Sequence, residues 1–375
     1  MKIRFIILFA FTFVAISVAQ QKPTIENPEI VFQNLLHKVT QKSSGVMMTV
    51  LAPNLNIQWS GAAGFDSKMK DQKLSDKQPF RIASITKTFT AVSILRLAEM
   101  GKLDINDPIQ AYISNKHKEI LKKDAYNLSA ITIKHCLQHT SGLFDYAVGN
   151  DDYVKTAIQN PDRRWTRTEQ IQFAIDHGNP VGKPGEIYHY SDTGYVLLGE
   201  IIERLTGKRL AEANRELINF DKLKLTTTWL QSLEPKPEGL KRQVSSYLNH
   251  IDATHWDNSV DLYGGGGYVS TTNDLTKFYH GLFNGKIFEK PETLKTMLSP
   301  NGITKQGNKA ESYRMGLWEI KTPYGNGFMH TGFWGSAVIH FLDYNATIAL
   351  YYVDSFNNDA MKGAFTEIVK LSRKK

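Results

Sequence analysis

The chain has 375 residues, a formal net charge of +8 and one cysteine, Cys136. A single cysteine excludes an internal disulfide and a cysteine-based metal cluster, so the fold must be stable through its hydrophobic core alone. The basic residues are scattered rather than gathered in a stripe interleaved with aromatic side chains, which argues against nucleic-acid binding.

The N-terminus has the pattern of an export signal. It reads MKIRFIILFAFTFVAISVAQ, with two basic residues, an apolar run and small residues at its end. The apolar run is short for a membrane helix, which needs about 20 residues. We therefore predict a signal peptide over residues 1–19 and no integral membrane segment after its cleavage. This places a bacterial protein in the periplasm or outside the cell, and a retained membrane anchor is the alternative interpretation.

The predicted elements change in kind along the chain. A surface helix over residues 27–42 precedes a β-hairpin made of VMMTVLAP and LNIQWSGAAGF. The middle is mostly helical, with well-marked helices over residues 84–100, 191–207 and 270–285. The end contains strands and one helix, which are SYRMGLWEI, GFMHTGFWGSAVIHFLD, ATIALYYVD and about residues 358–371.

This order predicts an α/β fold of the α+β type. Both chain ends supply one antiparallel sheet flanked by helices, and the centre forms a mostly helical subdomain. We expect a single domain over residues 20–375. Its sheet subdomain covers about 27–80 and 300–375, and its helical subdomain covers about 84–295. The helix that opens at Ser84 then starts at the seam between them, where clefts commonly form.

Ser84 and Lys87 are spaced like a nucleophile and its base. A lysine three residues after a serine lies on the same helix face, and burial disfavours its charged form. The same S-x-x-K spacing occurs at Ser67 and Ser372, but only Ser84 opens an apolar helix. The alternative is an ordinary helix-capping serine beside an exposed lysine.

Two further motifs follow in order. Tyr190-Ser191-Asp192 precedes a predicted helix, and His330-Thr331-Gly332 lies in a predicted strand. Together with the S-x-x-K motif they resemble the penicillin-recognising serine hydrolases, the group of class C β-lactamases, D,D-peptidases and related esterases. HTSGL, GKLDINDPI and GGGGYVSTTNDL extend the resemblance from about residue 27 to the chain end. It implies a β-lactamase/transpeptidase-like fold with no metal and no organic cofactor.

The resemblance also implies a role for each matched residue. Ser84 would be acylated, Lys87 would hold or accept its proton, and Tyr190 would pass a proton to the leaving group. The backbone N–H groups of Ser84 and Phe333 would bind the oxyanion. The predicted substrate-binding residues are Asp192, His330, Thr331, Gly332 and Phe333.

Two residues depart from the family pattern. Asp192 stands where the family usually has asparagine, and an ionised carboxylate near Lys87 favours the ammonium. Either Lys87 is then an electrostatic partner while Tyr190 takes the proton, or Asp192 is protonated. His330 replaces the commoner lysine, and a histidine is only partly charged near neutrality. This favours peptidases or esterases over potent β-lactamases.

Two other stretches have plain structural interpretations. His139 in HTSGL is predicted to fix a loop through hydrogen bonds rather than to act as a base. The glycines at 264–267 are predicted to allow a close backbone approach, because no P-loop lysine and serine follow them.

The function predicted from the sequence is an exported serine hydrolase that forms an acyl-enzyme on Ser84. It would be a D,D-carboxypeptidase, another peptidase or an esterase-like member of the family. Its substrate would be a peptidoglycan-type peptide, a β-lactam or an ester. The alternatives are a class C-type β-lactamase and a non-catalytic relative that binds peptides or the cell wall.

Overall fold

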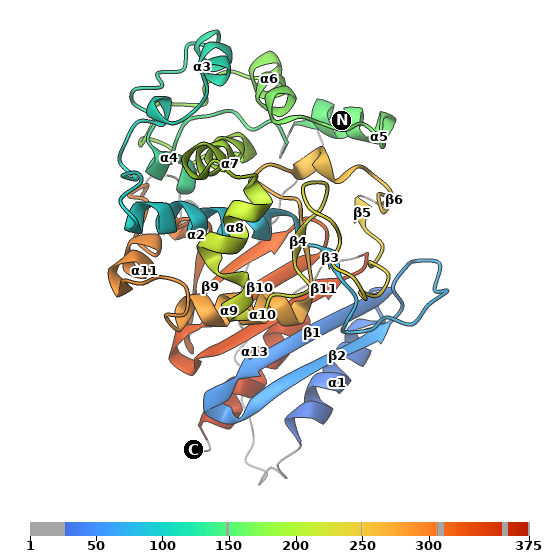
Figure 1. Ribbon diagram of the computed structural model, residues 1–375. Helices are drawn as coiled ribbons and strands as arrows, with labels where there is room; N and C mark the ends of the chain where they lie inside the picture. Colours follow the sequence, from blue (N-terminus) through green and yellow to red (C-terminus); the bar gives the residue numbers. More distant parts are fainter. Residues whose placement is uncertain are drawn as a thin grey trace.

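Figure 1 shows the computed structural model of the protein, which describes residues 27–147, 150–248, 250–304, 306, 311–354 and 359–373. The signal peptide predicted over residues 1–19 lies outside these residues. None of the helices in the described ranges is long and apolar enough to cross a membrane.

The main sheet of the described residues is antiparallel and has the strand order β2-β1-β11-β10-β9-β8. Its strands are β1 (Gly45–Ala52), β2 (Ile57–Gly64), β8 (Trp318–Thr322), β9 (Gly325–Gly332), β10 (Ser336–Phe341) and β11 (Ala346–Tyr352). Val46 of β1 lies opposite Tyr352 of β11, so the two ends of the chain meet inside the sheet. This confirms the predicted sheet from both chain ends.

Both faces of this sheet are covered by helices, as Figure 1 shows. α1 (Pro28–Val39) and α13 (Asp359–Ser372) pack on one face, and α10 (Thr272–Phe283) packs on the other. Strand β1 alternates accordingly. Val46 and Met48 join the cluster under α1 and α13, whereas Thr49 hydrogen-bonds Thr272 of α10 at 2.8 Å.

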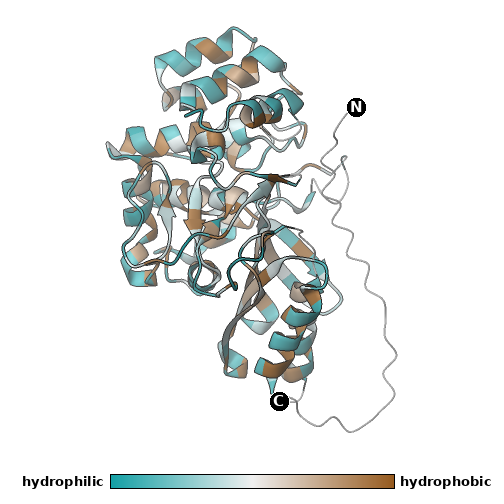
Figure 2. Ribbon diagram, turned by 90° about the vertical axis from the view of Figure 1, so that its right-hand side faces the viewer, coloured by the Kyte–Doolittle hydropathy of each residue, from teal (hydrophilic) through white to brown (hydrophobic). Residues whose placement is uncertain are grey.

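The central part of the chain is mostly helical and lies above the sheet in Figure 1, as predicted. Its helices are α2 (Thr86–Glu99), α3 (Asn115–Lys122), α4 (Ile133–Leu137), α5 (Asp151–Gln159), α6 (Arg167–His177), α7 (Asp192–Thr206), α8 (Leu210–Ile218), α9 (Phe220–Leu223) and α11 (Pro291–Met297). Figure 2 shows hydrophilic and hydrophobic residues sharing each outer helix, the pattern of helices with one buried face. The subdomain boundaries stay predictions.

Short elements complete the described fold. Two small sheets contain β3 (Phe80–Arg81), β7 (Tyr268–Ser270) and β4 (Trp229–Leu230) in one, and β5 (Tyr247–Leu248) and β6 (Ile251–Asp252) in the other. The 3₁₀ turns are η1 (Pro53–Leu55), η2 (Ala83–Ile85), η3 (Ile109–Ala111), η4 (Asn258–Asp261) and η5 (Leu342–Tyr344).

Helix α2 is the common core of both parts. Its residues from Thr86 to Leu95 are all buried, so it is surrounded by protein on every side. Phe89 stacks on Phe278 of α10 with ring centroids 3.8 Å apart, which joins α2 to the helix that packs on the sheet. This packing fixes the N-terminal end of α2, where Ser84 and Lys87 lie.

Two predicted elements differ from the structure. The strand predicted over residues 327–343 is two strands, β9 and β10, because the chain turns between Gly332 and Ser336 with Gly335 at φ 101°. The strand predicted from residue 312 begins only at Trp318. Before it, a tight turn has Gly316 at φ 78° and a hydrogen bond from Arg314 N–H to the Leu317 carbonyl.

Candidate active site

Ser84 lies in the 3₁₀ turn η2, between strand β3 and helix α2. The residue before it, Ala83, has φ 44°, a left-handed conformation that is strained for any residue with a Cβ atom. The Ser84 side chain caps neither η2 nor α2, whose N-cap positions are Ile82 and Ile85. The structure therefore excludes the helix-capping alternative for Ser84.

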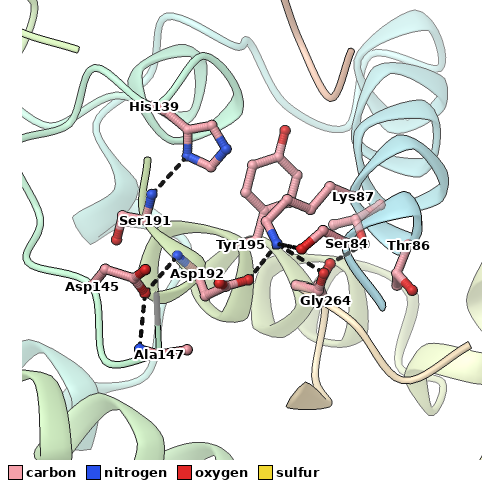
Figure 3. Close-up of polar contacts among 12 residues, drawn as sticks. Ser84, Thr86, Lys87, His139, Asp145, Ala147, Ser191, Asp192, Tyr195 and Gly264 are labelled. Atoms are coloured by element: carbon pink, nitrogen blue, oxygen red, sulfur yellow. Dashed lines mark hydrogen bonds and ion pairs between the residues drawn. The ribbon is translucent and has the colours of Figure 1, made fainter. Parts of the chain in front are cut away.

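Lys87 has a side chain with no exposed surface, and it points at Ser84 (Figure 3). Its Nζ donates hydrogen bonds to Ser84 Oγ at 3.1 Å and to the Gly265 carbonyl at 2.9 Å, and it forms an ion pair with Asp192. Burial disfavours a lysine ammonium, and a neighbouring carboxylate favours it. This geometry supports the alternative in which Lys87 is an electrostatic partner of Asp192.

Asp192 is the first residue of α7, and a second buried carboxyl group lies beside it. The Asp192 N–H donates to Asp145 Oδ1 at 3.0 Å, and the Ala147 N–H donates to the same oxygen at 3.1 Å (Figure 3). Burial, together with the negative charge of Asp192, raises the pKa of Asp145 well above its usual range. Asp145 therefore takes a proton more readily than an ordinary aspartate does.

Tyr190 completes the predicted catalytic group. Its ring lies between the rings of His139, at 4.1 Å, and Trp318, at 5.8 Å, and Lys87 Nζ is 4.9 Å from its centroid. Burial and the charge of Asp192 raise the pKa of the Tyr190 phenol well above its usual range, and a hydrogen bond with Ser84 acts in the opposite direction. The structure thus brings Ser84, Lys87 and Tyr190 together, and the phenol is protonated at rest.

His139 holds the segment that carries Tyr190. Its Nδ1 accepts a hydrogen bond from Ser191 N–H at 3.1 Å, and its carbonyl accepts one from His189 N–H at 2.8 Å. Burial and the charge of Lys87 lower the pKa of His139 well below its usual range, so the ring is neutral. These contacts confirm the predicted loop-fixing role.

The third motif approaches Ser84 from the end of β9. A Cβ atom at Gly332 would overlap the Ile82 carbonyl oxygen, which also accepts a hydrogen bond from Ser336 Oγ at 3.1 Å. Only glycine allows β9 to lie this close to the turn that holds Ser84. Phe333 is the next residue, and 40 % of its surface is exposed. The hydrogen bond of this turn runs from Gly335 N–H to the Gly332 carbonyl and does not involve the Phe333 N–H.

His330 differs from its sequence-based interpretation. The side chain has no exposed surface, and its Nδ1 donates to the Thr331 carbonyl at 2.8 Å. Burial, with a smaller contribution from Lys87, lowers the pKa of His330 to about 3. The ring is therefore neutral near pH 7, not partly charged, because no carboxylate compensates its burial. Substrate binding by His330 and the half-buried Thr331 stays a prediction.

The glycine loop at 264–267 lies against the lysine. A Cβ atom at Gly264, which has φ 133°, would overlap the Tyr195 carbonyl, and one at Gly265 would overlap the Asp192 carboxylate. The predicted close backbone approach is confirmed. The hydrogen bond from Lys87 to the Gly265 carbonyl was not predicted, since this contact joins residues far apart in the chain.

Comparisons with known proteins agree with this geometry. The family model described as Beta-lactamase matches residues 33–371. A penicillin-binding protein of Bacillus subtilis is 24 % identical over 338 residues, which cover 84 % of this chain and 70 % of that protein. Two solved structures share the fold with a TM-score of 0.76. They are a D-stereospecific amidohydrolase from Streptomyces, at 22 % identity over 90 % of this chain and 99 % of that one, and the D-amino acid amidase from Ochrobactrum anthropi SV3, at 24 % over 92 % and 99 %. The chain therefore belongs to the Beta-lactamase family, whose members are serine hydrolases.

Proposed function

We propose that the protein hydrolyses amides or esters through an acyl-enzyme on Ser84. The observation that carries this proposal is the 3.1 Å hydrogen bond between Lys87 Nζ and Ser84 Oγ, beside the half-buried ring of Tyr190. A serine becomes a nucleophile when a neighbouring group takes its proton as the new bond forms.

In the proposed acylation, Ser84 Oγ attacks the substrate's carbonyl carbon. The phenol of Tyr190 is protonated at rest, so it accepts the Ser84 proton only while it passes its own proton to the leaving group. The Lys87 ammonium stabilises the negative charge that develops between these groups, and the N–H groups of Ser84 and Phe333 bind the oxyanion. Water then attacks the acyl-enzyme with the proton transfers reversed, which frees the acid and regenerates the Ser84 hydroxyl.

The charges around Ser84 favour a substrate without a carboxylate next to the scissile bond. His330 is neutral, and the positive charge of Lys87 is already paired with Asp192. Neither group offers an unpaired cation to the carboxylate of a C-terminal D-alanine or a penicillin. We therefore place amino-acid amides, peptides cleaved away from their C-terminus and esters ahead of carboxypeptidase and β-lactamase substrates. The fold shared with the D-amino acid amidase and the D-stereospecific amidohydrolase supports amides of D-amino acids.

The test is a substrate panel run on matched variants. It contains a D-amino-acid amide, the same residue in a peptide with a free C-terminal carboxylate, a short-chain ester and a penicillin. We expect wild type to turn over the amide or the ester fastest. Intact mass should show an acyl adduct that Ser84→Ala lacks and that Ser372→Ala, altered at another S-x-x-K serine, retains.

Three results would count against this proposal. Absence of any adduct with the whole panel would exclude an acyl-enzyme. Tight binding that survives Ser84→Ala, without turnover by wild type, would instead support the non-catalytic alternative. Rapid turnover of the penicillin would move the assignment to the β-lactamase alternative.

Export to the periplasm or the medium is part of the proposal. It is supported by the basic, apolar and small-residue pattern of residues 1–19. Cell fractionation followed by N-terminal sequencing tests it, and a mature N-terminus at Gln20 is expected. Retention of Met1 in the cytosolic fraction would contradict it.

A further inference from the structure

A third buried carboxyl group, that of Asp261, packs against the glycine loop at 264–267. It lies against Gly266, the residue after the glycine that touches Asp192. Asp261 ends the turn η4 and is 8 % exposed, and neither of its carboxyl oxygens has a hydrogen-bond partner in the described part of the chain. A Cβ atom at Gly266 would lie 2.5 Å from Asp261 Oδ2, just as one at Gly265 would overlap Asp192. The loop that accepts a hydrogen bond from Lys87 thus has a carboxyl group packed against each of two successive glycines.

A buried arginine accompanies this carboxyl group. Arg81 ends strand β3, three residues before Ser84, and is 2 % exposed. Its guanidinium donates to two backbone carbonyls, those of Ala253 at 3.1 Å and Trp256 at 2.6 Å, and its Nε has no partner among the described residues. The charge of Asp261 favours the guanidinium form of Arg81, which shows that the two groups interact electrostatically.

Asp261 therefore faces charges from several elements. These charges are those of Arg81 in β3, Lys87 in α2 and Asp192 in α7. The charge of Asp261 in turn acts on the phenols of Tyr146 and Tyr153. With Asp261 ionised, the cations Arg81 and Lys87 face the carboxylates of Asp192 and Asp261, and the charge of Asp257 also acts on Arg81. With Asp261 protonated, the group around Lys87 carries one extra positive charge.

We propose that Asp261 is a positioning residue for the reaction at Ser84, and that its buried carboxyl group sets the charge around Lys87 according to pH. The inference rests on the proposed function, because it concerns the rate of Ser84 acylation. Burial raises the pKa of Asp261 to about 7, the charge of Asp192 acts in the same direction, and Arg81 and Lys87 oppose it. The charge state thus changes within the neutral range.

The direction of the effect follows from the charge that develops in acylation. Negative charge grows on the oxyanion and on the proton relay, and a nearby carboxylate opposes it. Ionised Asp261 therefore slows acylation, and protonated Asp261 does not. Asparagine has the shape of the protonated acid and stays neutral at every pH, so Asp261→Asn imitates the low-pH form of the wild type.

The experiment measures acylation by p-nitrophenyl acetate from pH 5 to pH 9 in wild type and Asp261→Asn. We expect the ratio of the variant's rate to the wild-type rate to rise from about 1 below pH 6 to about 3–10 above pH 8, with its midpoint near 7. Asp257→Asn is the matched control. It removes a carboxylate from the same segment, where Asp257 Oδ1 accepts the Ser259 N–H at 2.8 Å, and its ratio should not change with pH.

A ratio for Asp261→Asn that is constant across this pH range would overturn the proposal, whether its value is 1 or far below 1. If that variant does not fold, carbon-13 NMR of wild type labelled at its aspartate carboxyl groups decides instead. We expect a carboxyl signal that titrates near pH 7 in wild type and persists in Asp145→Asn, and the absence of such a signal contradicts the inference. This titration needs no turnover, so failure of the proposed function and failure of this inference are distinguishable.

Discussion

Lys87 and Asp192 form a buried ion pair, and the same lysine donates a hydrogen bond to Ser84, the proposed nucleophile. A carboxylate beside a lysine favours the ammonium form, so this pairing argues for Lys87 as an electrostatic partner rather than as the base. The proposed mechanism therefore gives the proton relay to Tyr190. The pair also neutralises a charge that would otherwise attract anionic substrates, and it therefore bears on both catalysis and specificity.

Replacing one partner of this pair tests its ionisation. We expect Asp192→Asn to lower the free energy of unfolding by about 1–3 kcal/mol, because Lys87 loses its buried counter-charge but keeps a neutral acceptor. Urea unfolding at pH 7 measures the change. Asp152→Asn is the control, since it breaks an exposed pair with Lys155, 2.9 Å apart, and should have no measurable effect. Equal stabilities of wild type and Asp192→Asn would show that the pair is not charged in the folded protein.

The two tyrosines beside Lys87 offer a second matched test. Lys87 Nζ lies 4.9 Å from the ring of Tyr190 and 5.6 Å from that of Tyr195, but Tyr195 Oη donates to the Leu137 carbonyl at 2.8 Å. We expect Tyr190→Phe to slow acylation by about 10²–10⁴-fold, because the proton relay is lost. Tyr195→Phe should acylate at nearly the wild-type rate and lose about 1 kcal/mol of stability. Stopped-flow acylation and urea unfolding measure these effects, and similar rates for both variants would remove Tyr190 from the mechanism.

Gly332 tests how closely β9 must approach Ser84. A methyl group there would overlap the Ile82 carbonyl, so Gly332→Ala must displace β9 from the oxyanion position. We expect acylation to fall by at least about 100-fold. Gly194→Ala, within helix α7, is the control. Its new Cβ would lie 3.5 Å from the Cβ of Cys136, an ordinary contact distance. That control should keep its activity and gain about 0.5–1 kcal/mol of stability. An active Gly332→Ala enzyme would show that the oxyanion is bound elsewhere.

His340 predicts an acid-side loss of stability. It packs parallel to Phe283 at 4.5 Å, and burial lowers its pKa to about 3. Between the unfolded value of about 6.5 and the folded value, only the unfolded chain binds this proton, so stability falls as pH falls. We expect His340→Phe to reduce that slope by about 1.4 kcal/mol per pH unit between pH 6 and 4. Urea unfolding at several pH values measures it. The exposed His255, changed to Phe, should leave the slope unaltered, and an unchanged slope in His340→Phe would mean that the folded protein protonates this ring.

The elements predicted correctly from the sequence are those that depend on residues close together in the chain. The helices predicted over residues 84–100 and 191–207 depend on neighbours within a few positions, and the structure contains α2 and α7 there. The hairpin predicted from VMMTVLAP and LNIQWSGAAGF is likewise present as β1 and β2. Which distant motifs would meet was predicted from the resemblance to a known family, not from local patterns.

What the sequence left out depends on contacts between distant segments. The neutral state of His330 follows from its complete burial, which a single strand does not reveal. Asp261 looks like an ordinary polar residue in a loop until the fold sets it against Gly266 and near Arg81. Ser84 lies in a 3₁₀ turn rather than at a helix cap because Ile82, at the start of that turn, is hydrogen-bonded on both sides. Its N–H donates to the Tyr268 carbonyl of β7, and its carbonyl accepts from Ser336 Oγ.

The pairing of β1 with β11 has a consequence for synthesis of the protein. The first hairpin of the chain has no lasting partner until nearly the last strand has left the ribosome, so the sheet cannot close during translation. A stop codon shortly before β11 would remove no residue of the catalytic group, yet it would leave the hairpin unpaired and β10 at an open edge. Inactivating mutations should therefore be as frequent near the C-terminus as around the nucleophile.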